Sequence, residues 1–253
     1  MTTIENIEVT VESGNPLAQV FVTIRASDGT TGQGEAWWGI PDRDMPGRSA
    51  LPIASTIENL ITPRLLGKKS GEIERHWFDL WDFGYRYADQ GIFLMGMSGV
   101  DIALWDLLAK QLGIPVVQIL GGQVHESIQA YASLPPLRDT DTVVAETQRA
   151  MEHGITAVKL HEVEAKYVHV LRDTFGDELE IMVDVNGHFN LQEATAFGLD
   201  IGTRGITWFE EPIRPMRDHA TIKKVAVETG LPIAAGENEY TVSDFDKLLT
   251  SDA

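Results

Sequence analysis

The feature that most constrains the fold is a repeat in the second half of the chain. Short apolar segments, each long enough for one buried strand, alternate there with longer segments of helical periodicity. The strand candidates start at almost equal intervals, near Ile128, Ile155, Glu180, Ile206 and Pro232. A repeat of this size holds one strand, one helix and two short loops, which predicts a parallel sheet covered by helices. Either an open doubly wound sheet or a (β/α)8 barrel has this pattern. No G-x-G-x-x-G loop follows the first strand, which weakens the dinucleotide-binding version of the doubly wound sheet.

The first half of the chain has a different pattern, in which strands come first and helices follow. Apolar and polar residues alternate along residues 4–39, and the Ser27-Asp28-Gly29 step between two alternating runs predicts a hairpin turn. Residues 49–67 and 98–113 then have apolar residues at helical spacing. We expect the second of these helices to begin at Ser98 as its N-cap and to end at Gly113 as its C-cap.

The repeat also bears on how much of a barrel the sequence contains. A sixth strand would begin near residue 257, whereas the sequence ends at Ala253. A (β/α)8 barrel would need three further units, about 75 to 100 residues. We therefore expect an α+β domain over residues 1–125 and an incomplete barrel, with about five βα units, over residues 126–253. The alternative is a genuine five-stranded open sheet.

Acidic residues lie at the ends of the last three predicted strands. Asp184, Glu210 and Glu237 are separated by 26 and 27 residues, which matches the repeat. The carboxyl ends of neighbouring parallel strands meet at one edge of a sheet, so we expect these three carboxylates to converge. Carboxylates that close repel one another unless a cation lies between them, and all-oxygen ligands favour Mg²⁺ or Mn²⁺. Glu211 remains an alternative to Glu210, because periodicity does not decide which of the two points inward.

Other polar residues follow the predicted strands at the same edge. Lys159 and His161 are two residues apart at the end of a buried strand, so their side chains point to the same face. Asn186, His188 and Asn238 come directly after strands and could reach the same pocket. Any one of these residues alone is more commonly a helix cap, a turn or a surface residue, and it is their combination that favours a site.

Composition limits the partners of the chain. Its 253 residues carry a formal net charge of −18. Nucleic acids and anionic membranes are bound by clustered Lys and Arg, so this charge argues against both partners. The chain has no cysteine, which excludes disulfides and thiolate ligands. We find neither the pattern of a signal peptide nor a run of about 18 apolar residues, and we expect a cytoplasmic protein.

Taken together, the motifs resemble those of the enolase superfamily, in its mandelate racemase and muconate lactonizing enzyme branch. In the first half, DGTTGQGEAWWG resembles the family's hairpin with its Gly-Glu signature, and SGVDIALWDLLAKQLGIPVVQILGG resembles its long helix and Leu-Gly-Gly exit. In the second half, DVNG, WFEEP and GEN resemble the three metal-ligand segments, in the right order and spacing. Each motif is weak alone, whereas all five together are highly specific.

The resemblance implies an α+β capping domain followed by a (β/α)8 TIM-type barrel and an essential Mg²⁺ ion, or Mn²⁺ in its place. The ion's ligands would be Asp184, Glu210 and Glu237. The shared reaction is removal of the proton α to the carboxylate of a small substrate, with the enediolate stabilised by the metal. Lys159 corresponds to the first lysine of the family's Lys-x-Lys motif. His161 replaces the second, which is commonly a base, so His161 is either the base or a substrate-binding residue.

In this family, loops of the capping domain close over the substrate. By position, Gly14-Asn15-Pro16 and Trp37-Trp38-Gly39 correspond to those loops. Trp38 therefore joins Asn186 and Asn238 as a candidate for substrate binding. The family tends to assemble, and we expect the full-length protein to be a homo-oligomer.

Three functions are consistent with these residues. The first is a Mg²⁺-dependent lyase that dehydrates a hydroxy acid or sugar acid. The second is a racemase, epimerase or cycloisomerase of the same superfamily. The third is a non-catalytic or inactive fragment. The choice of substrate, and a second base on later barrel strands, are not specified by this sequence.

Overall fold

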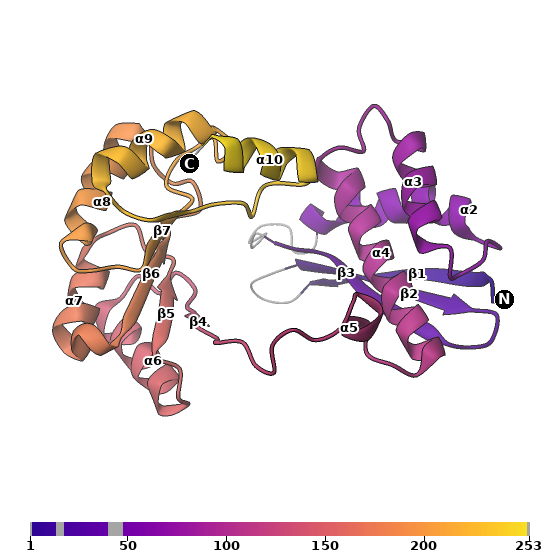
Figure 1. The fold of residues 1–253 in the computed structure, drawn as a ribbon, viewed down its shortest axis with the longest axis horizontal. Helices are drawn as coiled ribbons and strands as arrows, with labels where there is room; N and C mark the ends of the chain where they lie inside the picture. The colour runs from indigo at the N-terminus through magenta and orange to yellow at the C-terminus, as the bar shows by residue number, and fades with distance from the viewer. Residues whose placement is uncertain (1, 14–17, 40–47, 252–253) are drawn as a thin grey trace. The chain divides into compact units, whose positions relative to one another are not determined.

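The computed structural model describes residues 2–13, 18–39 and 48–251. The chain divides into two compact units, Met1–Glu126 and Ser127–Ala253. Each unit has its own sheet and its own helices, and Figure 1 shows both units with most of these elements labelled.

Unit 1 is built on an antiparallel sheet of three strands in the order β1-β2-β3. These are β1 (Ile4–Ser13), β2 (Ala18–Ala26) and β3 (Thr31–Gly39). The hairpin turn predicted at Ser27-Asp28-Gly29 is confirmed, because this step joins β2 to β3. Asp28 Oδ1 accepts a hydrogen bond from the Thr30 N–H at 2.9 Å, and Gly29 has a φ of 85°, which favours glycine.

Helical segments follow the sheet of unit 1. They are η1 (Arg48–Ala50), α1 (Leu51–Thr56), η2 (Ile57–Ile61), α2 (Thr62–Leu65), α3 (Ile73–Phe83), α4 (Gly91–Leu112) and α5 (Val116–Ile119). The helix expected over residues 49–67 is irregular, since η2 is a π-helical stretch. Pro63, which follows this stretch, cannot donate the backbone hydrogen bond that a regular α-helix would need there.

Helix α4 lies directly against β3 because glycines remove side chains where the two backbones meet. A Cβ atom on Gly34 would clash with the backbone carbonyl of Gly99, and one on Gly32 would clash with that of Ala103. The glycines of the TGQGEAWWG segment therefore have a packing role.

The long helix begins earlier than the sequence predicted. It starts at Gly91, so the expectation that Ser98 is its N-cap is wrong. The Ser98 hydroxyl instead donates to the Leu94 carbonyl at 2.9 Å, a bond that lets serine lie within a helix. Gly113 is confirmed as the C-cap, with a left-handed φ of 67°.

By length and composition alone, α4 could also cross a membrane. In the structure, however, 56% of its most apolar window is buried inside the protein. This burial, together with the close contact with β3, is what a core helix of a folded domain would have.

Unit 2 alternates strands with helices. Its sheet has the order β4-β5-β6-β7-β8, and all neighbouring pairs are parallel. The strands are β4 (Ala132–Ser133), β5 (Ala157–Leu160), β6 (Glu180–Asp184), β7 (Trp208–Glu210) and β8 (Ile233–Ala234). The helical segments are α6 (Thr140–Glu152), α7 (Lys166–Phe175), η3 (Gly176–Glu178), α8 (Leu191–Gly202), α9 (His219–Thr229) and α10 (Val242–Thr250). The five predicted strands are thus confirmed, each in the segment that the repeat indicated.

The two faces of this sheet differ in character. One face packs against α6 to α9 in a single apolar cluster that includes Val158, Ile181 and Phe209 of the strands. Their chain neighbours Lys159, Met182 and Trp208 are in register with one another and point to the opposite face. Helices on one face only are typical of a barrel, whereas a doubly wound sheet has helices on both.

The sheet curves toward the face that carries Lys159. Tyr131 precedes β4 and Trp208 starts β7, and β5 and β6 lie between these strands. A flat sheet would separate strands three positions apart by about 14 Å. The centroids of the two rings are nevertheless only 5.9 Å apart. The described strands form an open, barrel-like arc, consistent with part of the barrel that the resemblance implied.

Candidate metal and proton-transfer site

Charged residues gather where the strands of unit 2 end, on the face of the sheet away from the helices. Asp184 at the end of β6 is in register with Glu210 at the end of β7. Lys159, in β5, lies on the same face. Asp184 and Lys159 are buried and Glu210 is half-buried. The side chain of His161, two residues after Lys159, points to this face as well.

Three carboxylates meet at this edge. One oxygen each from Asp184, Glu210 and Glu237 lies within 4.8 Å of the other two. Asp184 and Glu210 reach the cluster from paired strand positions. Glu237 does not, because the β8 residue in register with Glu210 is Ala234, and Glu237 follows it in the loop. The predicted convergence of the three carboxylates is thus observed, although Glu237 reaches the cluster from a loop and not from a strand end.

Lys159 bridges two of the carboxylates. Its Nζ atom donates to Asp184 Oδ2 at 3.1 Å and to Glu210 Oε1 at 3.0 Å. Burial lowers the pKa of Lys159, but the hydrogen bonds and charges of Glu210 and Asp184 outweigh burial and raise this pKa above its usual value. Burial would raise the pKa of Asp184, but hydrogen bonds from His161 and the Asn186 backbone, together with the charge of Lys159, hold this pKa below its usual value. Lys159 is therefore a fixed positive charge within an acidic cluster.

His161 has a defined tautomer. Its Nδ1 atom lies 2.6 Å from the carbonyl oxygen of Leu134, which can only accept, so Nδ1 carries the proton. Its Nε2 atom faces the cluster, 3.4 Å from Asp184 Oδ2. The hydrogen bond with Asp184 is the main cause that raises the pKa of His161. Because the Asp184 carboxylate can only accept, this bond places a proton on Nε2, and the lone pair that a general base requires becomes available once His161 has given up that proton.

Glu210, rather than Glu211, belongs to the carboxylate cluster. Glu211 has a φ of 43°, which directs the chain away from the strand, and it is 2% exposed. Its Oε1 atom accepts a hydrogen bond from Asn238 Nδ2 at 2.7 Å. Its Oε2 atom has no hydrogen-bond partner within the described ranges. Burial raises the pKa of Glu211 to about 7.

The other polar candidates of unit 2 are placed differently from one another. Asn186 is exposed, and its backbone N–H donates to Asp184 Oδ1 at 2.9 Å. Asn238 is half-buried and is bonded to Glu211. His188 is exposed, and its ring packs edge to face on Phe189. Asn186 thus contacts Asp184 through its backbone, Asn238 contacts Glu211 outside the cluster, and His188 is exposed. Substrate binding by Asn186 and Asn238 remains a prediction.

The predicted lid residues belong to unit 1. The Trp38 backbone is in register with Gln19 in the β2–β3 pair, and its side chain lies outside the described part of the structure. Gly14-Asn15-Pro16 also lies outside the described residues. A role for these residues in binding the substrate remains a prediction.

Sequence analysis missed Trp208 as a residue of the site. Its indole Nε1–H donates to Glu210 Oε2 at 2.9 Å. Trp208 and Glu210 are two residues apart on one strand, so the two-residue period would have placed them on the same face.

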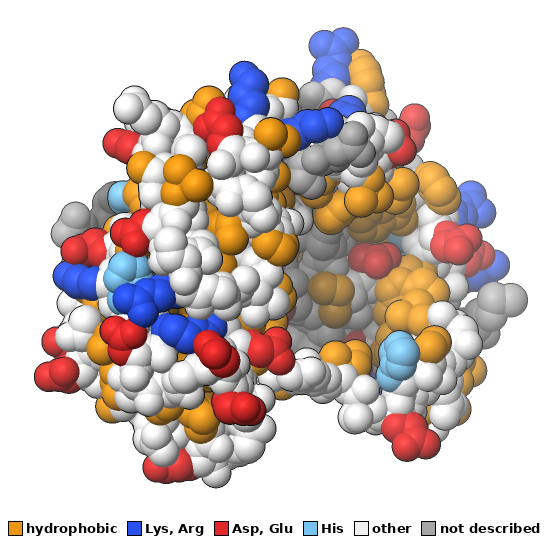
Figure 2. Space-filling model, turned by 60° about the vertical axis from the view of Figure 1, so that its left-hand side comes forward, with side chains coloured by type: hydrophobic (Ala, Val, Ile, Leu, Met, Phe, Trp, Pro, Cys, Tyr) orange, Lys and Arg blue, Asp and Glu red, His pale blue; other side chains and the backbone are white. Residues whose placement is uncertain are grey.

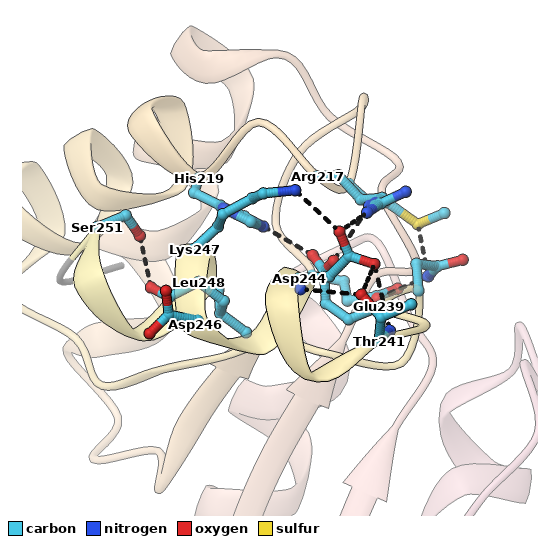
Figure 3. A network of polar contacts seen from close by, with 12 residues as sticks. Arg217, His219, Glu239, Thr241, Asp244, Asp246, Lys247, Leu248 and Ser251 are labelled. Carbon is cyan, nitrogen blue, oxygen red and sulfur yellow. Dashed lines mark hydrogen bonds and ion pairs between the residues drawn. The ribbon is translucent and has the colours of Figure 1, made fainter. Parts of the chain in front are cut away.

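A second polar network, shown in Figure 3, was also missed. The side chain of Glu239 is 3% exposed and accepts hydrogen bonds from Arg217 Nε at 3.0 Å and from His219 Nε2 at 2.7 Å. Arg217 also pairs with Asp244 at 2.6 Å, and Asp244 forms a capping box with Thr241 at the start of α10. The network ties the loop after β7 to the loop after β8, which carries Glu237.

The donor set of the cluster fits a hard divalent cation. Its atoms are carboxylate oxygens, and the negative charges of Asp184, Glu210 and Glu237 exceed the single fixed positive charge of Lys159. Burial, and then the charge of Asp184, raises the pKa of Glu237, and a cation between the carboxylates would remove that repulsion. The outer surface lacks such a concentration of acidic groups on the face that Figure 2 displays, where acidic side chains are interspersed with basic and apolar ones.

Comparisons with known families cover both units. Residues 2–121 match the family described as "Mandelate racemase / muconate lactonizing enzyme, N-terminal domain". Residues 142–253 match the family described as "Enolase C-terminal domain-like". The chain belongs to the enolase superfamily. Its branch is that of mandelate racemase and muconate lactonizing enzyme, as the sequence motifs indicated.

Individual enolase-superfamily proteins are similar to much of the chain. An arabinonate dehydratase from Saccharolobus solfataricus is 28% identical over 246 residues, which cover 93% of this chain and 63% of that protein. A 3,6-anhydro-D-galactonate cycloisomerase from Zobellia galactanivorans has a TM-score of 0.87 at 30% identity, covering 99% of this chain and 70% of that one. A mandelate racemase/muconate lactonizing protein from Paracoccus denitrificans, complexed with magnesium, has a TM-score of 0.85 at 26% identity and the same coverage, 99% and 70%. The chain spans less than two thirds of the length of the curated relatives it matches.

Proposed function

We propose that the protein is a Mg²⁺-dependent enzyme that removes the proton α to the carboxylate of a hydroxy acid or sugar acid and then eliminates water. The observation that carries the proposal is the convergence of Asp184, Glu210 and Glu237 within 4.8 Å, on the face that also bears Lys159 and His161. Relatives that are arabinonate and D-galactonate dehydratases support the elimination of water. The magnesium in the similar structure from Paracoccus denitrificans supports the choice of ion.

Each charged residue would have a separate role. Asp184, Glu210 and Glu237 would hold the ion. When bound, Mg²⁺ would stabilise the negative charge that develops on the substrate carboxylate as the proton leaves. Lys159 adds a second fixed positive charge beside the same carboxylate, where a water-excluded site makes such charges effective.

His161 would take the proton. Leu134 holds the proton on Nδ1, so in the neutral ring the lone pair of Nε2 would point into the site. The α-proton moves to Nε2, and the electrons of the C–H bond move into the carboxylate. The hydroxyl on the next carbon then leaves with a proton as water, and the protonated imidazole can supply that proton. The resulting enol becomes a 2-keto acid, so atoms and charge balance.

The test is incubation of the protein with Mg²⁺ and a panel of sugar acids in deuterated water. We expect at least one acid to form a 2-keto acid, or to exchange its α-proton, as followed by proton NMR. His161→Asn should abolish exchange while Mn²⁺ still binds, and Glu8→Gln, on the exposed surface of β1, should behave like the wild type. Exchange that persists in His161→Asn would make His161 a binding residue instead of the base.

Cycloisomerisation is the second candidate, favoured by the similarity to the cycloisomerase from Zobellia galactanivorans. The two reactions share the first proton transfer but differ in their products. Dehydration lowers the mass of the substrate by one water, whereas cycloisomerisation leaves the mass unchanged. Mass spectrometry of the product therefore distinguishes them.

A further inference from the structure

We infer that Trp208 is a positioning residue of the metal site, which holds the Glu210 carboxylate through its indole N–H and is itself held by Tyr131. The inference rests on the proposed function, since it takes Glu210 to be a ligand of the ion. It assigns a role to two aromatic residues that lie outside the carboxylate cluster.

Both oxygens of Glu210 are anchored by different donors. Oε1 accepts from Lys159 Nζ at 3.0 Å, and Oε2 accepts from Trp208 Nε1 at 2.9 Å. The first donor comes from β5 and the second from β7, so the plane of the carboxylate is held from two directions. A carboxylate offers about four lone-pair positions, so these two bonds leave room for a cation.

The indole of Trp208 has its own support. The Tyr131 ring meets it edge to face, with centroids 5.9 Å apart and an angle of 80° between the planes. Lys159 Nζ lies 5.8 Å from the centroid of the same Tyr131 ring. Tyr131, Trp208, Glu210 and Lys159 therefore form a closed ring of contacts, which involves residues at three strands.

This role of Trp208 is separable from core packing. The apolar cluster under the helices contains Phe209, the neighbour of Trp208, but not Trp208 itself. Trp208 is half-buried on the opposite face of the sheet. Replacing its indole N–H should therefore alter Glu210 and leave the apolar core intact.

The first experiment compares the Mn²⁺ affinity of metal-free wild type and Trp208→Phe, with free Mn²⁺ measured by electron paramagnetic resonance. Phenylalanine keeps an aromatic ring against Tyr131 but has no N–H. We expect Trp208→Phe to bind Mn²⁺ about 10- to 100-fold more weakly, as is typical when a partner of a metal ligand is removed. Trp208→His, which retains a ring N–H, should recover part of the loss.

Trp105→Phe is the matched control. The Trp105 indole lies near the Asp101 carboxylate in α4, so this variant removes an indole N–H beside a carboxylate far from the carboxylate cluster in sequence, within unit 1. Its Mn²⁺ affinity should equal that of the wild type. Mn²⁺ should also quench part of the tryptophan fluorescence of the wild type and of Trp105→Phe, and that part should be missing in Trp208→Phe.

The outcomes separate the two proposals. If Asp184→Asn loses Mn²⁺ binding but Trp208→Phe binds like the wild type, the metal site stands and the role of Trp208 is overturned. If the wild type does not bind Mn²⁺, or Asp184→Asn binds it normally, both proposals fail. If Trp208→Phe does not fold, Tyr131→Leu decides, because freeing the indole should weaken Mn²⁺ binding several-fold, and an unchanged affinity would overturn the inference.

Discussion

The two sheets of the molecule use the alternation of residues along a strand for different purposes. In unit 1, β2 fully buries Val20, Val22 and Ile24, and the residues between them are partly exposed. In unit 2, β5 buries all of its residues, including Lys159, and β6 buries the run from Ile181 to Asp184. Alternation separates the core from solvent in the first sheet, and the core from a charged site in the second.

Polar side chains in the two sheets obtain their hydrogen-bond partners in different ways. A polar side chain on the outer face of β1 or β2 can be satisfied by water. Lys159 and Asp184 have little access to water, so Lys159 is satisfied by Asp184 and Glu210, and Asp184 by Lys159 or by a bound ion. Substitutions that are harmless on the outer face of unit 1 should therefore be severe on the inner face of unit 2.

The largest effect is expected for Asp184→Asn. Removing this buried charge removes one proposed ligand of the ion and the partner of both Lys159 and His161. We expect Mn²⁺ affinity to fall more than about 100-fold and substrate deuterium exchange to fall about 1,000-fold or more. Isothermal titration and proton NMR measure the two effects. Glu8→Gln, a similar loss of charge on exposed β1, should change neither, and normal turnover of Asp184→Asn would refute the ligand assignment.

The next largest effect is expected for Gly34→Ala in unit 1. The added Cβ would clash with the backbone carbonyl of Gly99, so β3 and α4 would have to move apart. We expect the free energy of unfolding to fall by about 3 kcal/mol, measured by urea denaturation and circular dichroism. Mn²⁺ affinity should be retained under native conditions. A loss below about 0.5 kcal/mol would show that the two backbones are not in tight contact.

The sequence predicted those features that follow from periodicity. The repeat located β4 to β8, and the alternation around Asp28-Gly29 located the hairpin between β2 and β3. The same period placed Asp184 and Glu210 at paired strand ends. These predictions held because hydrogen bonding between neighbouring strands fixes the register and the face of each side chain.

Features that depend on the path of the backbone could not be predicted in this way. The left-handed φ of Glu211 turns it out of the strand, and periodicity carries no sign of this turn. Glu237 reaches the cluster from a loop. This loop is held by the ion pair between Arg217 and Glu239, and Glu239 lies two residues after Glu237. Ser98 has the chemistry of an N-cap, but a hydrogen bond to Leu94 satisfies it inside the helix.

Glu211 should make the stability of the metal-free protein depend on pH. Its pKa of about 7 in the folded state exceeds the usual value of 4.5, so the folded protein holds the proton more tightly than the unfolded chain. Stability should therefore fall as the pH rises from about 4.5 to about 7, by at most about 3 kcal/mol. Glu211→Gln cannot ionise, so its stability should vary less across this range and exceed that of the wild type at higher pH. Urea denaturation at several pH values measures the difference, and parallel curves for the two proteins would contradict the assignment.

The smallest effect is expected for Gly29→Ala, which completes the comparison at the hairpin of unit 1. Gly29 has a φ of 85°, but a Cβ there would meet no atom within 4 Å. The cost is therefore conformational alone, and we expect a loss of about 1 kcal/mol in the free energy of unfolding.

Gly71→Ala is the matched control, because Gly71 also has open space around it but is not among the glycines with positive φ. It should be neutral or slightly stabilising, since alanine restricts the unfolded chain. Together with Gly34→Ala, these variants all replace glycine by alanine. Gly34→Ala tests a steric clash, Gly29→Ala tests backbone strain, and Gly71→Ala introduces neither. Equal stabilities of Gly29→Ala and Gly71→Ala would mean that the hairpin tolerates a side chain in this turn and that its glycine is not required by conformation.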